Sequence, residues 1–316
     1  MGTAAKAGKT SIRIVSIAVD TAVLIAILLL VAIGCYALWD SNQVYRSAAA
    51  DQYARYRPTN ENQGLTFEEL KAINPDVFAW LTVYGTHIDY PVVRGENNMR
   101  YVNTNAEGKY SLSGAIFLDF QNCRDFTDFN SILYGHHMER NAMFGEIGNF
   151  AEFEYFEARK YGMLYFNGKE HGLEFFTFIH ADAYDRLVFR TNNTSEEEKQ
   201  RYLEYIYELA VHTRDIEITT DDRIVLLNTC SNFSTNGRDI LIGRITDELF
   251  DDPFRVDEAE EYRIIFGIDV PLGFWTQSPL WLRITIITLP LIALVLLVSF
   301  LIKRRRRGDN CETGDN

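Results

Sequence analysis

Two long apolar runs near the ends of the chain stand out in its pattern of hydrophobic and polar positions. Residues 21–39 carry no charge, and residues 284–302 form a second run that leads directly into five basic residues, 303–307. A helix of about 20 apolar residues spans the hydrocarbon core of a bilayer. We therefore predict transmembrane helices at 14–39 and 283–302, with a buried core helix as the alternative for each.

Basic residues beside these runs predict how the chain is oriented in the membrane. Lys6, Lys9 and Arg13 precede the first run, and the basic cluster follows the second. Because basic residues concentrate on the cytoplasmic side, we expect a cytoplasmic N-terminus at 1–13, a cytoplasmic basic tail at 303–316 that contacts membrane lipid, and an extracellular region between the spans. No small-residue cleavage site follows the first run, which favours an uncleaved anchor over a signal peptide.

Short strand-like segments fill the region 76–250. Strands are predicted around Gly85-Thr86 within 77–93, and at 113–119, 130–135, 222–230 and 238–245, and Asn167-Gly168 predicts a hairpin turn. A helix is expected from Ser195 to about residue 212 and a short one at 143–150. The pattern predicts a mainly β fold with α decoration, a β-barrel at 76–250 preceded by a helical spacer at 40–75. The stretch 251–282 is expected to connect to the second span, with 262–270 as one more strand or part of that connector.

The net charge of −13 comes from acidic residues between the two apolar runs, which argues against a nucleic-acid partner. The four cysteines are too few for a disulfide framework, although a bridge between Cys123 and Cys230 is one alternative. The cysteine and histidine spacings match no metal-binding motif, so we predict no metal site and no cofactor.

Three residues at the ends of predicted strands are candidates for chemistry. Cys230 ends an apolar run, His136 ends another after a glycine, and Arg238 opens the strand after a seven-residue loop. A thiolate, an imidazole and a guanidinium are the groups that acyl transfer through a thioester requires. The alternatives are a buried cysteine, a structural histidine, and an arginine that is a surface charge or forms an ion pair with Asp239 or a nearby acid. Arg244, six residues further along the strand, is the weaker arginine candidate.

The segments Tyr134-Gly135-His136 and Asn228-Thr229-Cys230, with Arg238 leading an apolar strand, resemble the sortases, the membrane-bound cysteine transpeptidases of Gram-positive bacteria. The order WLTVYGTHIDYPVV, GENNMRYVN, SGAIFLD and then YGH, with a long helix before the cysteine strand, is similar to the class B pattern over residues 65–246.

This resemblance implies an eight-stranded sortase-type β-barrel, flanked here by the two transmembrane helices. It implies that Cys230 is the nucleophile, His136 the general acid/base and Arg238 the residue that binds the oxyanion or positions the substrate. The substrate would be a surface protein with a C-terminal sorting signal, cleaved after a threonine and passed to an amine of a peptidoglycan precursor. Thr229, Ser231 and Tyr184 are expected to contact the substrate.

Three features depart from the class B pattern. His137 stands where asparagine is common, the only Asp-Pro-aromatic segment lies near the C-terminal end at 252–254, and a C-terminal span is commoner in pilin-polymerising class C enzymes. A pilin polymerase with a lysine acceptor is therefore an alternative function. A non-catalytic membrane-anchored scaffold is another, and a papain-like hydrolase fits poorly because its cysteine precedes its histidine.

Overall fold

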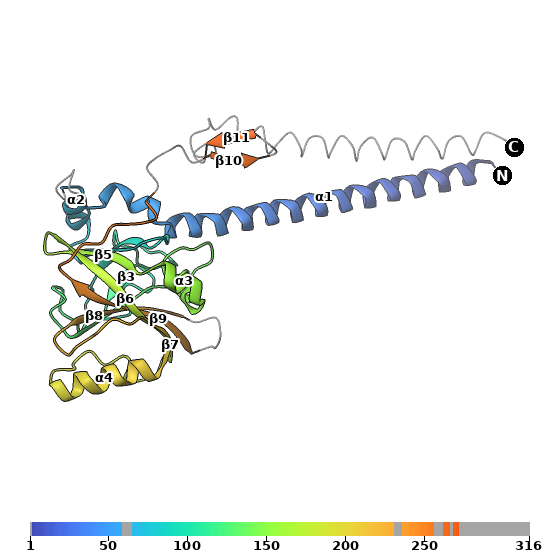
Figure 1. Ribbon diagram of the computed structural model, residues 1–316. Helices are drawn as coiled ribbons and strands as arrows, with labels where there is room; N and C mark the ends of the chain where they lie inside the picture. Colours follow the sequence, from blue (N-terminus) through green and yellow to red (C-terminus); the bar gives the residue numbers. More distant parts are fainter. Residues whose placement is uncertain (1, 59–64, 231–235, 256–261, 266–267, 272–316) are drawn as a thin grey trace. The chain divides into compact units, whose positions relative to one another are not determined.

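The computed structural model describes residues 2–58, 65–230, 236–255, 262–265 and 268–271 (Figure 1). The chain divides into two compact units, residues 1–254 and 255–316. The first unit begins with the long helix α1 (Gly2–Ala48), a 3₁₀ turn η1 (Ala50–Tyr56) and α2 (Leu65–Ile73). Strands and three further short helical elements follow.

A closed ring of eight strands forms the body of the first unit. The strands are β1 (Val77–Val83), β2 (Asp89–Val93), β3 (Ile116–Leu118), β4 (Asn130–Tyr134), β5 (Tyr161–Phe166), β6 (Lys169–Asp182), β8 (Arg223–Cys230) and β9 (Gly237–Thr246). Their order is β5-β1-β2-β3-β4-β8-β9-β6, and the pairing of β5 with β6 closes the ring. The prediction of an eight-stranded β-barrel is confirmed. A ninth strand, β7 (Ala210–Thr213), pairs with β6 outside the ring.

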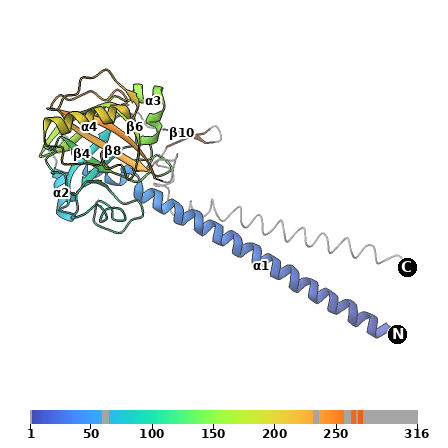
Figure 2. The same ribbon diagram turned by 90° about the horizontal axis from the view of Figure 1, so that it is seen from below.

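Strand β8 is buried on both of its faces. Val225 and Leu227 belong to the core inside the barrel, whereas Ile224 and Leu226 belong to a second apolar cluster. Helix α4 (Glu196–Glu208) supplies Tyr202 and other side chains to that second cluster and covers this part of the barrel (Figure 2). Double burial explains why the sequence of β8 is an uninterrupted apolar run without alternation.

Local sequence signals explain the turn between β5 and β6 and the start of α4. Asn167 and Gly168 have φ values of 52° and 76°, the left-handed conformation of a two-residue hairpin turn. Ser195 caps α4 in a capping box with Glu198. The predicted length of this helix was wrong: it ends at Glu208, because residues 210–213 pair with β6 as β7.

The remaining helical elements are short and lie between β4 and β5. They are η2 (Ile147–Ala151), which covers part of the segment predicted as helix at 143–150, and α3 (Phe153–Ala158). In the second unit, β10 (Tyr262–Ile265) and β11 (Ile268–Pro271) pair as an antiparallel hairpin, so two strands replace the one expected at 262–270.

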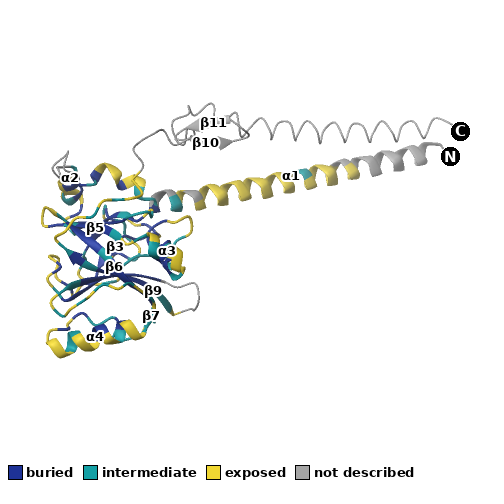
Figure 3. Ribbon diagram, viewed as in Figure 1, coloured by how far each residue is buried: buried dark blue, intermediate teal, exposed yellow. Residues whose placement is uncertain are grey.

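Among the described residues, one helical stretch, Ala18–Tyr56, has the length and apolar composition needed to cross a membrane. Its apolar side chains are exposed along most of the described part of α1 (Figure 3), whereas the strands bury theirs. Side chains that find no apolar partner within the protein fit a lipid environment. The second predicted span, at 283–302, lies outside the described residues.

Candidate active site

The strand register brings the three predicted catalytic residues to the same edge of the barrel. Strands β4 and β8 are parallel neighbours, their last registered pair is Tyr134 with Asn228, and the Gly135 N–H donates to the Asn228 carbonyl at 3.1 Å. His136 and Cys230 each lie two residues beyond that pair. On the other side of β8, Cys230 pairs with Arg238 of β9. Neighbouring strands lie about 4.8 Å apart, so the three backbones are adjacent.

Gly135 allows the chain to pass between two packed side chains just before His136. A Cβ atom at this position would lie 2.6 Å from Cδ1 of Ile116 and 2.6 Å from Cδ2 of Phe144. A larger residue here would therefore require these side chains or the end of the strand to move. The Phe144 N–H also donates to the His136 carbonyl at 3.0 Å, which fixes the backbone from the other direction.

A backbone carbonyl orients the His136 ring. Nε2 of His136 lies 2.8 Å from the carbonyl oxygen of Val102, in the loop between β2 and β3. A carbonyl only accepts hydrogen bonds, so Nε2 carries the proton in this arrangement. In the neutral ring, Nδ1 is then the nitrogen with a free lone pair.

A cavity of about 360 Å³ opens at this edge of the barrel. His136, Thr229 and Arg238 line it, together with an aromatic group in which Tyr134 is stacked between Phe117 and Phe189. The centroid distances in this stack are 5.2 Å and 6.5 Å.

The hydroxyl of Tyr134 takes no part in proton transfer at neutral pH. It donates to Asp119 Oδ2 at 3.1 Å, and burial, reinforced by this carboxylate, raises the pKa of Tyr134. The phenol therefore stays protonated, and His136 is the imidazole in the described wall of the cavity.

Two buried polar groups beside the cavity lack a hydrogen-bond partner among the described residues. They are Oδ1 of Asn228 and Oγ1 of Thr229, and the two residues are 4% and 1% exposed. An unpaired buried polar atom costs about 1–3 kcal/mol.

Two charged residues near the site, Asp239 and Arg244, have structural partners. Asp239 Oδ1 lies 2.8 Å from Nδ1 of His180, so this carboxylate, one of the alternative partners considered for Arg238, has a histidine as its partner. Arg244 pairs with Glu174 and lies six residues along β9 from the site.

The other predicted site residues lie as follows. Tyr184 is 78% exposed and its neighbour Ala183 lines the cavity, whereas Ser231 lies outside the described residues.

Cys123 is an exposed free thiol, so the alternative of a Cys123–Cys230 bridge was wrong. The Asp128 carboxylate raises the pKa of the Cys123 thiol and disfavours its thiolate form. Among the described residues no cluster of three or more histidine, cysteine or acidic side chains offers a metal site.

Sequence reasoning missed Val102, Phe117, Phe189 and Asn228. Asn228 had a detectable signal, because a polar residue within an apolar buried strand calls for a partner. Val102 had no such signal in the sequence, since it contributes a backbone atom from an irregular loop.

The Asp-Pro-aromatic segment at 252–254 lies elsewhere on the barrel. The Phe254 ring packs against Gly85 and lies 5.2 Å from the Arg159 guanidinium.

A larger cavity, of about 650 Å³, lies at the opposite ends of β4 and β8. Polar residues such as Asp128 and Asn193 of the loops and Lys199 of α4 line it, and its described lining contains no cysteine or histidine. The smaller cavity is therefore the better candidate for acyl-transfer chemistry.

Comparison with known proteins places the chain in a family. No protein-family model matches it. It is 31% identical to sortase B of Staphylococcus aureus over 57% of this chain and 74% of that protein, and 26% identical to sortase B of Listeria monocytogenes over 65% and 85%. A crystal structure of a Streptococcus pyogenes class B sortase involved in pilus biogenesis is 43% identical, with a TM-score of 0.53, over 58% of this chain and 99% of that one. The barrel is that of a transpeptidase of the sortase type, and the chain belongs to the class B sortases.

Proposed function

We propose that the protein cleaves the C-terminal sorting signal of surface proteins through a thioester on Cys230 and transfers the acyl group to an amine. The observation that carries this proposal is the strand register, which pairs Cys230 with Arg238 and pairs Tyr134 with Asn228, two residues before His136 and Cys230 respectively. The similarity to class B sortases supports the transpeptidase activity.

The proposed first half-reaction moves one proton and exchanges one bond. The Cys230 thiol passes its proton to His136, and the thiolate attacks the carbonyl carbon that follows the signal threonine's Cα. Arg238 stabilises the resulting oxyanion, and the cation on the adjacent strand also favours the thiolate. His136 then returns the proton to the departing amine as the C–N bond breaks, leaving the thioester.

In the second half-reaction, an amine attacks the thioester and His136 accepts its proton. The C–S bond breaks, the sulfur recovers a proton from His136, and a new amide is released. A free cysteine with a pKa of about 8.5 is only a few per cent thiolate at neutral pH, so the attacking thiolate is a minor species that forms by proton transfer to His136, and we expect a bell-shaped pH profile.

The cavity beside these residues is the proposed binding site for the signal. Asn228 and Thr229 line this cavity, and we propose that a polar group of one of them bonds a peptide group of an extended substrate. The stacked ring of Tyr134 offers an apolar wall. We propose that Ser231 contacts the acyl group and that exposed Tyr184, next to Ala183, contacts signal residues outside the cavity.

Two acceptor amines are considered. The first is the amine of a peptidoglycan precursor, and the second is a lysine of a pilin subunit. The similarity to a Streptococcus pyogenes class B sortase involved in pilus biogenesis favours keeping the pilin as a second candidate. In either case the exposed apolar α1 supports a membrane-anchored enzyme, which we propose to cross the membrane twice with the barrel outside the cell.

The test is a reaction of the full-length protein in detergent with a peptide library that carries a central threonine. Candidate amines, a peptidoglycan cross-bridge peptide and a pilin lysine peptide, are supplied together, and products are read by mass spectrometry. We expect cleavage after threonine and one amine joined to the new end. A scaffold protein would leave the library intact, as would the Cys230→Ala control.

A further inference from the structure

The loop between β2 and β3, residues 94–115, carries the carbonyl group that orients His136. It contains no helix or strand of the barrel, yet Val102 is held 2.8 Å from Nε2 of His136. An irregular segment keeps such an alignment only when other contacts fix it. Two independent sets of contacts meet at residues 101 and 102.

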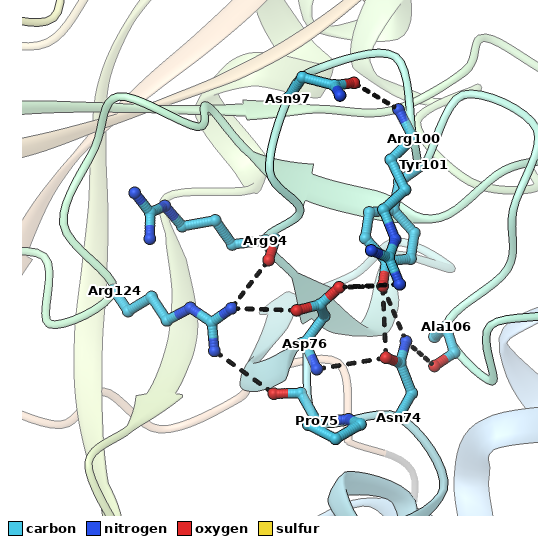
Figure 4. A network of polar contacts seen from close by, with 9 residues as sticks. All are labelled: Asn74, Pro75, Asp76, Arg94, Asn97, Arg100, Tyr101, Ala106 and Arg124. Carbon is cyan, nitrogen blue, oxygen red and sulfur yellow. Dashed lines mark hydrogen bonds and ion pairs between the residues drawn. The ribbon is translucent and has the colours of Figure 1, made fainter.

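The first set holds the side chain of Tyr101 (Figure 4). Its ring is buried, its hydroxyl donates to Oδ2 of Asp76 at 2.8 Å, and it accepts from Nδ2 of Asn74 at 3.0 Å. The same Asn74 nitrogen donates to the Ala106 carbonyl at 2.9 Å. Burial raises the pKa of Tyr101, so its hydroxyl remains a donor throughout the neutral range.

Asp76 is itself held by two arginines, Arg100 within this loop and Arg124 in the segment that follows β3. Nη2 of Arg124 donates to Oδ1 of Asp76 at 3.2 Å and to the Arg94 carbonyl at 2.9 Å, and Nη2 of Arg100 lies 3.4 Å from Oδ2 of Asp76 (Figure 4). The two arginines therefore hold the carboxylate in the orientation in which it accepts from the Tyr101 hydroxyl. This junction ties the start of β1 to the loop that faces His136.

The second set is a close backbone approach. Gly114 has a φ of 61°, and a Cβ atom there would lie 2.5 Å from the Tyr101 carbonyl oxygen and 2.6 Å from the Val102 carbonyl oxygen. The Ala115 N–H donates to the Tyr101 carbonyl at 3.1 Å. The direction of the Val102 carbonyl therefore depends on a glycine at position 114.

We propose that Tyr101, with Asn74, Asp76 and Gly114, is a positioning residue that aims the Val102 carbonyl at His136 and thereby selects the Nε2–H tautomer. Nδ1 of His136 is then the atom that exchanges protons with the thiol and the amines. A backbone carbonyl thus does here what an acidic side chain does for the histidine of a serine protease triad. The role of Nδ1 in proton exchange rests on the proposed function, whereas the tautomer of His136 is inferred from the Val102 contact alone.

The experiment uses full-length protein labelled with ¹⁵N-histidine in detergent micelles. The His136 signals are assigned by their loss in His136→Gln. We expect the wild type to show a protonated Nε2 and an unprotonated Nδ1 in the neutral ring, and Tyr101→Phe to convert this to a mixture of tautomers. The matched control is Tyr110→Phe, which removes a hydroxyl from a residue of the same loop that is 79% exposed.

Kinetics on the peptide cleaved by the wild type give the second readout. Tyr101→Phe is expected to lower kcat about tenfold with KM unchanged, since a 1 Å misplacement costs up to about 100-fold. Gly114→Ala is also expected to lower kcat and leave KM unchanged. Tyr110→Phe is expected to keep the wild-type kcat and KM. Two results overturn the proposal. The first is a neutral His136 ring in the wild type that is protonated on Nδ1, which can be observed even if no variant folds. The second is a Tyr101→Phe variant whose His136 tautomer and kcat are the same as those of Tyr110→Phe. If the tautomer changes as expected while no variant cleaves peptide, the positioning holds and the proposed function fails.

Discussion

Substitution of Gly135 by alanine tests whether the packing at the end of β4 sets the position of His136. The new Cβ would lie 2.6 Å from carbon atoms of both Ile116 and Phe144, where ordinary contacts begin at 3.4 Å. Either these buried side chains or the backbone must move by about 0.8 Å. Both neighbours belong to the close-packed core, so the strand end carries much of the movement.

Two magnitudes follow from this displacement. Overpacking a core by one methyl group lowers the free energy of unfolding by about 1–3 kcal/mol. A shift of about 1 Å in a catalytic group costs up to about 100-fold in kcat, equivalent to about 2.7 kcal/mol in the activation barrier. The variant should therefore lose far more activity than its folded fraction explains.

The assay measures thermal unfolding and kcat for the same full-length preparations. Gly168→Ala is the matched control: it meets no atom within 4 Å, but its φ of 76° should cost about 1–2 kcal/mol of stability away from the site. We expect similar unfolding losses and a drop in kcat confined to Gly135→Ala. Equal kcat values for the two variants would refute the argument that this packing positions His136.

Three further predictions follow from the site and from α4. Arg238→Lys keeps the charge but loses the planar fork, so kcat should fall at least tenfold; an unchanged kcat would show that charge alone suffices. Phe189→Ala removes one side of the Tyr134 stack and should raise KM more than it lowers kcat, which steady-state kinetics would show. Hydrogen bonds from the Ser195 and Thr194 backbone and from Arg190 lower the pKa of Glu198 to about 2. Because this value lies below the ordinary 4.5, Glu198→Gln should lower the melting temperature at pH 7 and the deficit should shrink as the pH falls from 4.5 toward 2; a constant deficit would contradict this.

Local patterns were sufficient to predict the strands and the ends at which the candidate residues stand. The turn at Asn167-Gly168 and the cap at Ser195 depend on neighbouring residues alone, and both are present. The length of α4 was not predictable in the same way. Residues 210–213 become a strand because the edge of β6 offers hydrogen-bond partners, which is a tertiary effect.

The geometry of the site depends on contacts between distant segments. The register of β4 with β8 joins residues almost a hundred positions apart, and no local pattern states which pair is level. The resemblance to sortases predicted that Cys230, His136 and Arg238 share one site. The role of the Val102 carbonyl could not be predicted, because a backbone group does not change the pattern of side chains. Backbone groups of irregular loops become visible as functional groups only when the fold is known.

The most direct test of the cooperation of Cys230, His136 and Arg238 is to trap the acyl-enzyme. Full-length protein is mixed with the cleaved peptide without an amine acceptor, quenched in acid and digested for mass spectrometry. The account predicts an adduct on the peptide that contains Cys230, abolished by Cys230→Ala and strongly reduced by His136→Ala or Arg238→Ala, with exposed Cys123 unmodified. Cleavage at the wild-type rate in Cys230→Ala, or an adduct on Cys123 instead, would contradict it.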